Sequence, residues 1–164
     1  MSDTAPILIA YDGSESSRHA IAEAAPLLAG RRALVVVARS AMESVAAHLE
    51  GHDAVAHEPD EPAERAAAEG VRAARAAGLD ADGMVVTGEG SVGQTITETA
   101  ERVGAPMIVL GSRANHGLRS LALGSVSRQV VHDARRPTLV VPVRSPATDL
   151  GESRRGDPRS LAPD

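Results

Sequence analysis

The chain has 164 residues, enough for one domain and a short tail. It has no cysteine, which excludes thiolate catalysis, a disulfide framework and thiol-bound metals. All 17 basic residues are arginine, which excludes a P-loop and Schiff-base chemistry because both need lysine. Its one aromatic residue, Tyr11, argues against recognition of single-stranded nucleic acid by base stacking.

The formal net charge is −5, and 43% of the residues are hydrophobic. Acidic residues are concentrated in residues 43–69, whereas residues 111–136 carry an excess of arginine, which is typical of solvated faces or of an anion site in an acidic protein. No apolar run approaches the roughly 20 residues of a membrane span, and no basic segment precedes an apolar one at the N-terminus. We therefore expect a cytoplasmic protein with no membrane or nucleic-acid partner.

Five short apolar runs are predicted as β-strands, because they are too short for helices and rich in Val and Ile. Such runs are typical of strands that are buried on both faces of a parallel sheet. The predicted strands cover residues 7–11, 33–38, 84–87, 107–110 and 138–143.

A helical pattern follows the first strand, and Ser14 is a suitable N-cap for it. Pro26 should kink or shorten its last turn. The apolar stripe of this predicted helix consists of Ala20, Ile21, Ala24, Leu27 and Leu28.

Three further helical patterns separate the later strands. One covers residues 60–77 and ends before Gly78, one begins at Ser91 and stops at Gly104, and one covers about 125–134. A short helix is expected around residues 44–49.

Strands that alternate with helices indicate βαβ units, a parallel sheet and right-handed crossovers. We therefore predict an α/β domain over residues 1–144. Residues 145–164 are rich in Pro, Gly, Ser and mixed charges, and they are predicted to form a disordered tail.

Two carboxyl ends of strands carry candidate binding residues, and ligands of open parallel sheets collect at such ends. The first strand runs into Tyr11-Asp12-Gly13-Ser14, and the fourth runs into a glycine-punctuated loop from Gly111 to Gly124. Backbone N–H groups at the start of the following helix are suited to bind phosphate. The alternative interpretation is that these glycines only form turns and Ser125 only caps the helix.

These segments resemble the universal stress protein family over about residues 5–144. The resemblance rests on ILIAYDGSESS, GAPMIVLGSR, LGSVSRQVV and RRPTLVVPV. It implies a single doubly wound five-stranded parallel sheet, Rossmann-like, with helices on both faces. It also implies ATP, with Mg²⁺, between the first and fourth strands, and a homodimer paired through the last strand, which begins at Thr138 and ends at Val143.

The resemblance further implies roles for particular residues. Asp12 would reach the ribose and adenine end, Ala10 and Tyr11 would line the base, and Ala38 would close its apolar side. Since Tyr11 is the only aromatic residue, its fluorescence should then change when ATP binds. The implied phosphate loop contains Gly111, Arg113, Ala114, Gly117, Gly124, Ser125, Val126 and Ser127.

The chain departs from the family's phosphate pattern G-x-x-G-x9-G-[ST] at one position, where Ala114 replaces the second glycine. If that position has positive φ, alanine costs about 1 to 2 kcal/mol, which weakens binding roughly 5- to 30-fold. A forked contact from Arg113 to phosphate would offset part of this loss.

His48, His52 and His57 lie among acids in a polar insert, so a metal site there is conceivable, but solvated side chains are the favoured interpretation. His116 lies in the phosphate loop and is expected to be exposed.

Three functions fit these residues. The first is an ATP-binding dimeric regulatory module of the stress response, with no catalytic residue, at most slow ATP hydrolysis and an unknown protein partner. The second is a dimeric scaffold that has lost nucleotide binding through Ala114. The third is an adenylating or nucleotidyl-transferring enzyme, which is disfavoured because YDGSESS stands where such enzymes carry SGGxDS or HxGH motifs.

Overall fold

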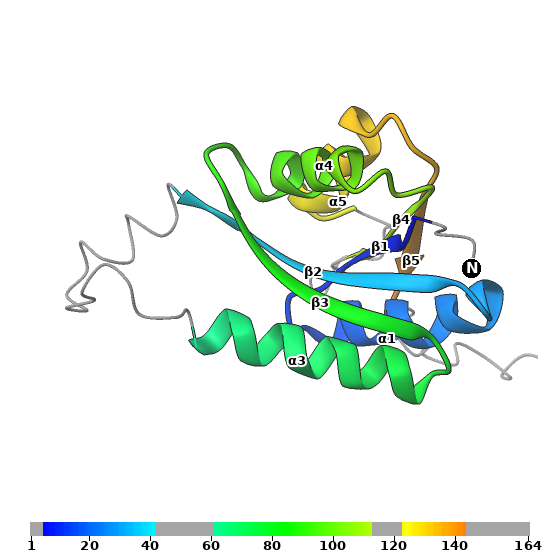
Figure 1. Cartoon of the computed structure of the whole chain (residues 1–164). Helices are drawn as coiled ribbons and strands as arrows, with labels where there is room; N and C mark the ends of the chain where they lie inside the picture. Colours follow the sequence, from blue (N-terminus) through cyan, green and yellow to red (C-terminus); the bar gives the residue numbers. More distant parts are fainter. Residues whose placement is uncertain (1–4, 42–60, 113–122, 144–164) are drawn as a thin grey trace, which may run out of the picture.

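The computed structural model describes residues 5–41, 61–112 and 123–143. Within them a five-stranded sheet has the strand order β3-β2-β1-β4-β5, and every neighbouring pair is parallel (Figure 1). The strands are β1 (Ile7–Ala10), β2 (Arg32–Ser40), β3 (Asp80–Gly88), β4 (Ile108–Ser112) and β5 (Thr138–Pro142). The helices are α1 (Glu15–Ala24), the short 3-10 helix η1 (Ala25–Leu28), α3 (Glu61–Ala76), α4 (Val92–Arg102) and α5 (Ser125–Asp133).

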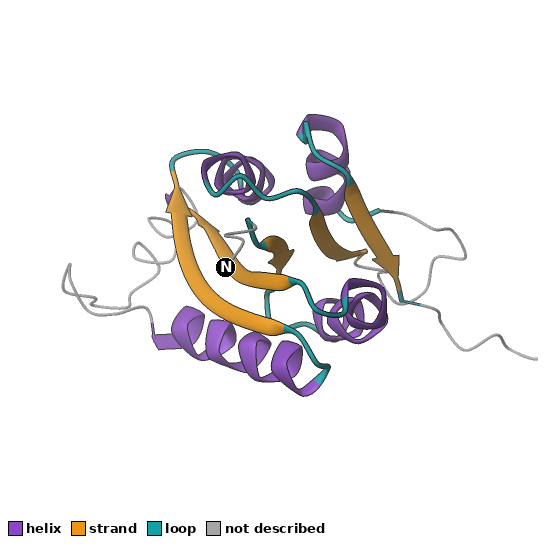
Figure 2. Ribbon diagram, turned by 45° about the vertical axis from the view of Figure 1, so that its right-hand side comes forward, coloured by secondary structure: helices purple, strands orange, loops and turns teal. Residues whose placement is uncertain are grey.

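Helices cover both faces of the sheet, as predicted (Figure 2). Side chains alternate across a strand, so β1 supplies two separate cores. Ile7 and Ile9 pack with residues of α1 and α3, whereas Leu8 and Ala10 pack with residues of α4 and α5. Strand order reverses beside β1, because β2 pairs on one side of it and β4 on the other. The carboxyl ends of β1 and β4 therefore meet where a doubly wound sheet binds its ligands.

The predicted helix ends are confirmed by their capping geometry. The hydroxyls of Ser14 and Ser91 accept hydrogen bonds from the third helical N–H of α1 and α4. Gly78 and Gly104 have φ of +91° and +64°, and each ends its helix with a Schellman pair of hydrogen bonds.

Pro26 shortens the first helix as expected, because the α-helical part ends at Ala24 and η1 takes over. The tighter winding of η1 changes which side chains face the sheet. Leu28 is buried, but Leu27 is 74% exposed, so its predicted place in the apolar stripe is wrong.

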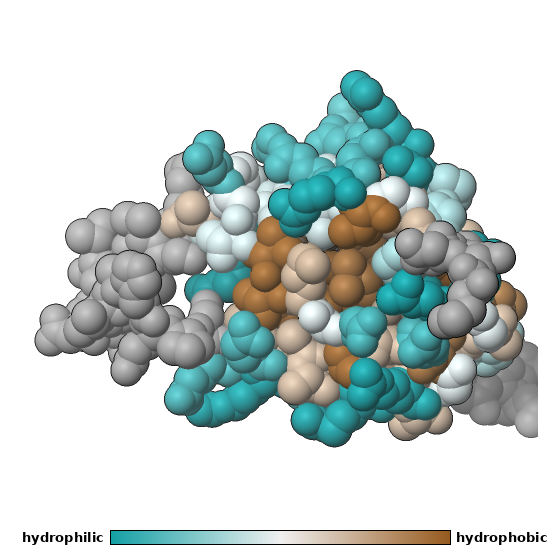
Figure 3. Space-filling view, in the orientation of Figure 1, coloured by the Kyte–Doolittle hydropathy of each residue, from teal (hydrophilic) through white to brown (hydrophobic). Residues whose placement is uncertain are grey.

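The prediction that the strands are buried on both faces holds for β1 and for most of β2 and β4. It fails for the two edge strands, β3 and β5, which are more exposed. Strand β3 begins at Asp80 rather than at residue 84, and Asp80 and Asp82 lie near Arg32 of β2. Figure 3 shows apolar surface between polar helical faces on the side of the molecule that β3 borders, and Met84 is 36% exposed there. Strand β5, at the other edge, is mostly half-buried.

Several predictions concern residues outside the described ranges. These are the helix at 44–49, the histidines of the insert, His116 and the tail at 145–164. In the described part of the chain, no helix is both long and apolar enough to cross a membrane. The same residues bring together no group of three or more His, Asp or Glu that could hold a metal ion.

Candidate functional site

A cavity of about 450 Å³ opens at the carboxyl edge of the sheet, between the ends of β1, β2 and β4. In a parallel sheet, each helix that follows a strand begins at the carboxyl edge of the sheet. The amino ends of α1, α4 and α5 therefore also border the cavity. The cavity is lined by Ala10, Tyr11, Asp12, Ser14, Ser16, Ser17, Val36, Ala38, Arg39, Val92, Ile96, Leu110, Gly111, Gly124, Ser125, Val126 and Ser127.

One wall of the cavity is apolar. It is built from Val36 and Ala38 of β2, Val92 and Ile96 of α4, and Leu110 of β4. Most of these side chains belong to the core on the α4 and α5 side of the sheet. The wall is therefore a continuation of that core, and it offers an apolar surface to a ligand.

A second wall of the cavity contains the amino end of α5. Gly124 is the N-cap residue with φ −61° and ψ 165°, and among the described residues no side chain caps this helix end. The first intrahelical bond runs from Arg128 N to Gly124 O at 2.9 Å. The N–H groups of the three preceding residues, Ser125, Val126 and Ser127, therefore have no acceptor inside the helix, and this end of the helix favours an anion.

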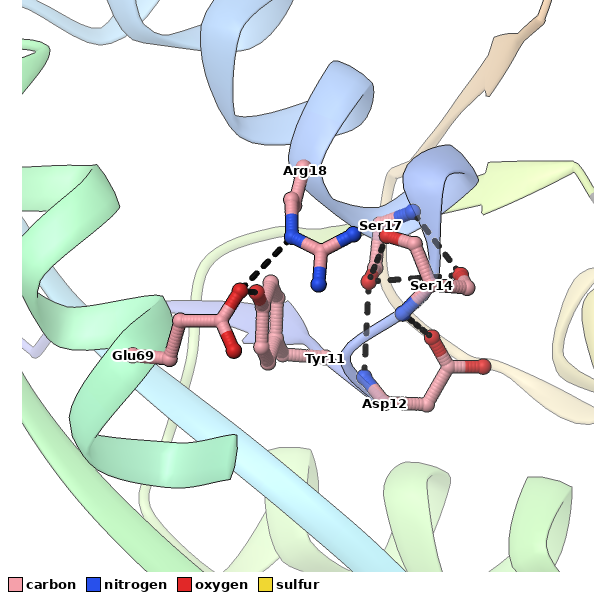
Figure 4. Close-up of polar contacts among 6 residues, drawn as sticks. All are labelled: Tyr11, Asp12, Ser14, Ser17, Arg18 and Glu69. Atoms are coloured by element: carbon pink, nitrogen blue, oxygen red, sulfur yellow. Dashed lines mark hydrogen bonds and ion pairs between the residues drawn. The ribbon is translucent and has the colours of Figure 1, made fainter. Parts of the chain in front are cut away.

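Residues 12–17 supply the third side of the cavity; this segment, called the 12–17 turn below, comprises the turn after β1 and the first three residues of α1. Asp12 Oδ1 accepts a hydrogen bond from Ser14 N at 3.0 Å, and Ser14 Oγ accepts one from Ser17 N at 3.2 Å (Figure 4). Gly13 has φ +76°, a conformation that glycine adopts without cost. The Asp12 side chain remains exposed, so a carboxylate stands at the rim of the cavity.

Gly111 is needed for close packing. A Cβ atom built on Gly111 would lie 2.4 Å from both the backbone oxygen and the hydroxyl oxygen of Ser16. That hydroxyl donates a buried 2.7 Å hydrogen bond to the backbone oxygen of Ser112. The first turn of α1 is therefore seated directly on the end of β4, and the absence of a side chain at Gly111 permits it.

Tyr11 borders the cavity, but its hydroxyl points to the opposite face of the sheet. Its side chain packs in the core beneath α3, and its hydroxyl donates to Glu69 Oε1 at 2.8 Å (Figure 4). Burial, followed by this bond to Glu69, raises the pKa of Tyr11 to about 12. The side chain of Tyr11 therefore packs in a different core from the apolar wall, whereas its contact with a bound base and the fluorescence change on binding stay predictions.

All nine predicted site residues that the structure describes line the single cavity set out above. Arg113, Ala114 and Gly117 fall outside the described residues. Sequence reasoning missed Ser16, Ser17 and Arg39 and most of the apolar wall. Ser16 and Ser17 follow Asp12 closely, which is a signal of proximity, but only the fold brings Val92 and Ile96 of α4 to the end of β1.

The sequence model of the universal stress protein family matches residues 4–142. A universal stress protein from Thermus aquaticus, encoded in the 3′ region of a QAH/OAS sulfhydrylase, is 34% identical to this chain. The stress response protein NhaX of Bacillus subtilis is 29% identical. Each alignment covers 82% of this chain and 96% of the relative. The chain therefore belongs to the universal stress protein family.

Solved structures share the fold. A universal stress protein from Archaeoglobus fulgidus superposes with a TM-score of 0.65 at 23% identity, covering 84% of this chain and 98% of that chain. The structure of a universal stress protein from Archaeoglobus fulgidus in complex with dAMP gives a TM-score of 0.61 at 22% identity, with the same coverage. A family member from Arabidopsis thaliana with AMP bound gives 0.58 at 13% identity, covering 87% and 94%. The predicted Rossmann-like fold is thereby confirmed.

Proposed function

We propose that this protein binds ATP in the cavity between β1 and β4 and acts as a nucleotide-dependent regulatory module. The observation that carries the proposal is the pairing of two walls in one cavity of about 450 Å³. One wall is apolar and suits a purine base, and the other presents the uncapped amino end of α5, which suits a phosphate. Structural neighbours in complex with dAMP and with AMP support an adenine nucleotide as the ligand.

The residues fit the parts of a nucleotide in the following arrangement. The base lies against Ala10 and Ala38, Asp12 accepts hydrogen bonds from the ribose, and the phosphates meet the N–H groups of Ser125, Val126 and Ser127. Mg²⁺ prefers oxygen ligands and keeps phosphate oxygens in its shell, so Asp12 together with serine hydroxyls is a suitable donor set. In this proposal Mg²⁺ screens the phosphate charge from the Asp12 carboxylate.

Regulation, rather than fast catalysis, is the proposed role. The sequence has no lysine to hold the terminal phosphate, and Asp12 is the one acid that lines the described cavity. A protein partner then recognises the ATP-bound form of the protein, and slow hydrolysis of the nucleotide ends that form.

Isothermal titration calorimetry on nucleotide-free protein tests the proposal, with ATP and AMP titrated in the presence and absence of Mg²⁺. We expect heat from both nucleotides and tighter binding of ATP, because more phosphate oxygens reach the amino end of α5. If neither ATP nor AMP gives heat, the proposal is overturned in favour of a scaffold that has lost nucleotide binding.

Asp12→Ala probes the ribose contact in the same titrations. A hydrogen bond to a charged group contributes about 1.5 to 3 kcal/mol, so the Kd for ATP is expected to rise at least about tenfold. Asp133→Ala is the matched control, because Asp133 is the last residue of α5, at the end remote from the cavity. Equal affinities of the two variants would remove Asp12 from the site.

We further propose that the protein is a homodimer paired through β5. Strand β5 lies at one edge of the sheet and pairs with β4 on its other side. An edge strand of apolar residues presents unpaired backbone groups that another strand can satisfy. Pro142 has no N–H group, so it limits the pairing at the end of the strand.

A further inference from the structure

One carboxylate oxygen holds both ends of the 12–17 turn. Tyr11 precedes this turn and Arg18 follows it. The Tyr11 hydroxyl donates to Glu69 Oε1 at 2.8 Å, and Arg18 Nε donates to the same atom at 2.6 Å (Figure 4). Glu69 lies in the middle of α3, which has no residue in the cavity lining.

In the middle of the 12–17 turn, the hydroxyl of Ser16 ties the chain to β4 through its buried 2.7 Å hydrogen bond to the backbone oxygen of Ser112. Only Tyr11 N, which donates to Val36 O at 2.9 Å, continues the strand ladder beyond β1. Within the turn, the bond from Asp12 N to Ser17 Oγ is long at 3.5 Å. The position of Asp12, which lies at the start of the turn and is not held by the Ser16 bond, therefore depends on what fixes the two ends of the turn.

The surroundings of Glu69 strengthen its two bonds. The ring of Tyr11 is buried beneath α3, where Gly70 leaves room for it: a Cβ atom on Gly70 would lie 2.9 Å from the ring. The hydrogen bond from Arg18, followed by that from Tyr11, lowers the pKa of Glu69. The carboxylate thus stays ionised, and charge-assisted hydrogen bonds are stronger than neutral ones.

We propose that Glu69 is a positioning residue for the nucleotide site: its carboxylate fixes the 12–17 turn at both ends and so sets where Asp12 and the first turn of α1 meet the ligand. This inference rests on the proposed function for the identity of the ligand. The staple itself, defined as the Tyr11–Glu69–Arg18 contact, is independent of any ligand.

Amide hydrogen exchange of the ligand-free protein tests the staple alone. Glu69→Ala is expected to speed exchange at the N–H groups of Ser14 and Ser17 at least about fivefold, while the strands of the sheet keep their protection. Glu64→Ala is the matched control, since Glu64 is an exposed residue of the same helix. Unchanged exchange in the turn, or equal changes in both variants, would overturn the proposal.

Tyrosine emission gives a second readout without nucleotide. A phenol that donates to a carboxylate emits weakly, and this chain contains one tyrosine and no tryptophan. Emission should rise in Glu69→Ala and in Glu69→Gln and stay unchanged in Glu64→Ala. Equal emission of all four proteins would show that the Tyr11 bond does not form in solution.

The effect on the site is measured as the Kd for ATP. We expect Kd to rise about fivefold in Glu69→Ala and to stay unchanged in Glu64→Ala. Arg18→Met in the Glu69→Ala background should add little, because both changes break one network. Wild-type affinity in Glu69→Ala would overturn the positioning role. If wild-type protein itself binds no ATP while the exchange result holds, the proposed function fails and the staple stands.

Discussion

At the residue scale, Tyr11 shows how far a single side chain can be assigned from its neighbours in sequence. The sequence predicts that Tyr11 lies at the carboxyl end of the first strand, and the structure places it directly after Ala10, the last residue of β1. Strand alternation then sends its side chain beneath α3, away from the apolar wall that contains Ala38. The sequence indicates the position, but the face is decided by the pairing of β1 within the sheet.

Tyr11 also makes the stability of the protein depend on pH, and the lack of lysine and cysteine allows its effect to be measured separately. With no lysine or cysteine, Tyr11 is the one side chain expected to titrate between about pH 9 and 12. Its pKa of about 12 in the folded protein lies above the ordinary value of 10.0. The stability it contributes is therefore complete below pH 10 and is lost as the pH rises through 12.

Urea unfolding at pH 9 and pH 11 measures this effect. Wild-type protein is expected to lose about 1 kcal/mol of unfolding free energy over that interval, because the unfolded chain ionises its tyrosine first. Tyr11→Phe should be less stable at pH 9 and nearly flat across the same interval. An equal loss in both proteins would show that Tyr11 does not cause the alkaline slope.

At the scale of elements, the helix ends and most strand ends could be predicted to within one or two residues, whereas the start of β3 could not. Caps depend on local chemistry, so Ser14, Ser91, Gly78 and Gly104 could be read from the sequence. The start of β3 could not, because Asp80 is a poor strand former. It is held in the sheet by pairing with Arg32 of β2, a long-range contact that no local pattern encodes.

Gly70, in the middle of α3, distinguishes helix propensity from packing. Propensity alone predicts that Gly70→Ala stabilises the helix by about 1 kcal/mol. The added Cβ would instead lie 2.8 Å from Val35 Cγ1 and 2.9 Å from the Tyr11 ring, both buried. We therefore expect Gly70→Ala to lower the unfolding free energy by about 1 to 3 kcal/mol.

Chemical denaturation checks this sign. Ala68→Gly, at an exposed position of the same helix, provides the reference for propensity and should cost about 1 kcal/mol. A Gly70→Ala variant more stable than wild type would mean that α3 does not pack this closely on β1 and β2.

At the scale of the whole molecule, the sheet offers two edges through which the proposed dimer could pair. Both β3 and β5 are edge strands, and each carries a threonine: Thr87 in β3 and Thr138 in β5. The proposed dimer uses β5, whereas β3 is the longer and more exposed strand. The two edges can be compared with matched substitutions.

Sedimentation equilibrium is expected to give a dimer for wild-type protein and for Thr87→Arg. Thr138→Arg brings like charges from two copies to one interface and should shift the equilibrium to monomer, most strongly at low salt. Circular dichroism confirms that both variants fold. A monomeric wild type would refute the dimer, and dissociation by Thr87→Arg alone would assign it to β3.

The candidate site combines residues that sequence motifs predict with residues that only the tertiary fold brings to the cavity. Asp12 and the start of α5 follow from motifs, because a strand that runs into a helix places its next residues at the carboxyl edge whatever the rest of the chain does. The apolar wall does not follow in this way. Val92 and Ile96 reach the cavity only because α4 packs on β2 and β3 and against α5, and Glu69 reaches Tyr11 and Arg18 only because α3 packs on the other face of the sheet.

The sequence by itself determined the strand and helix order, the caps, the parallel sheet and a composition without lysine, in which a proposed phosphate contact falls to arginine, hydroxyls or backbone N–H groups. The elements and caps follow from interactions between residues near in the chain, and the parallel sheet follows from the alternation of strands with helices. Tertiary structure alone decided that Gly111 makes room for Ser16, that Tyr11 binds Glu69 and that β3 extends along β2. Those features are contacts between distant residues, and their geometry exists only once the sheet has its order and both faces are packed.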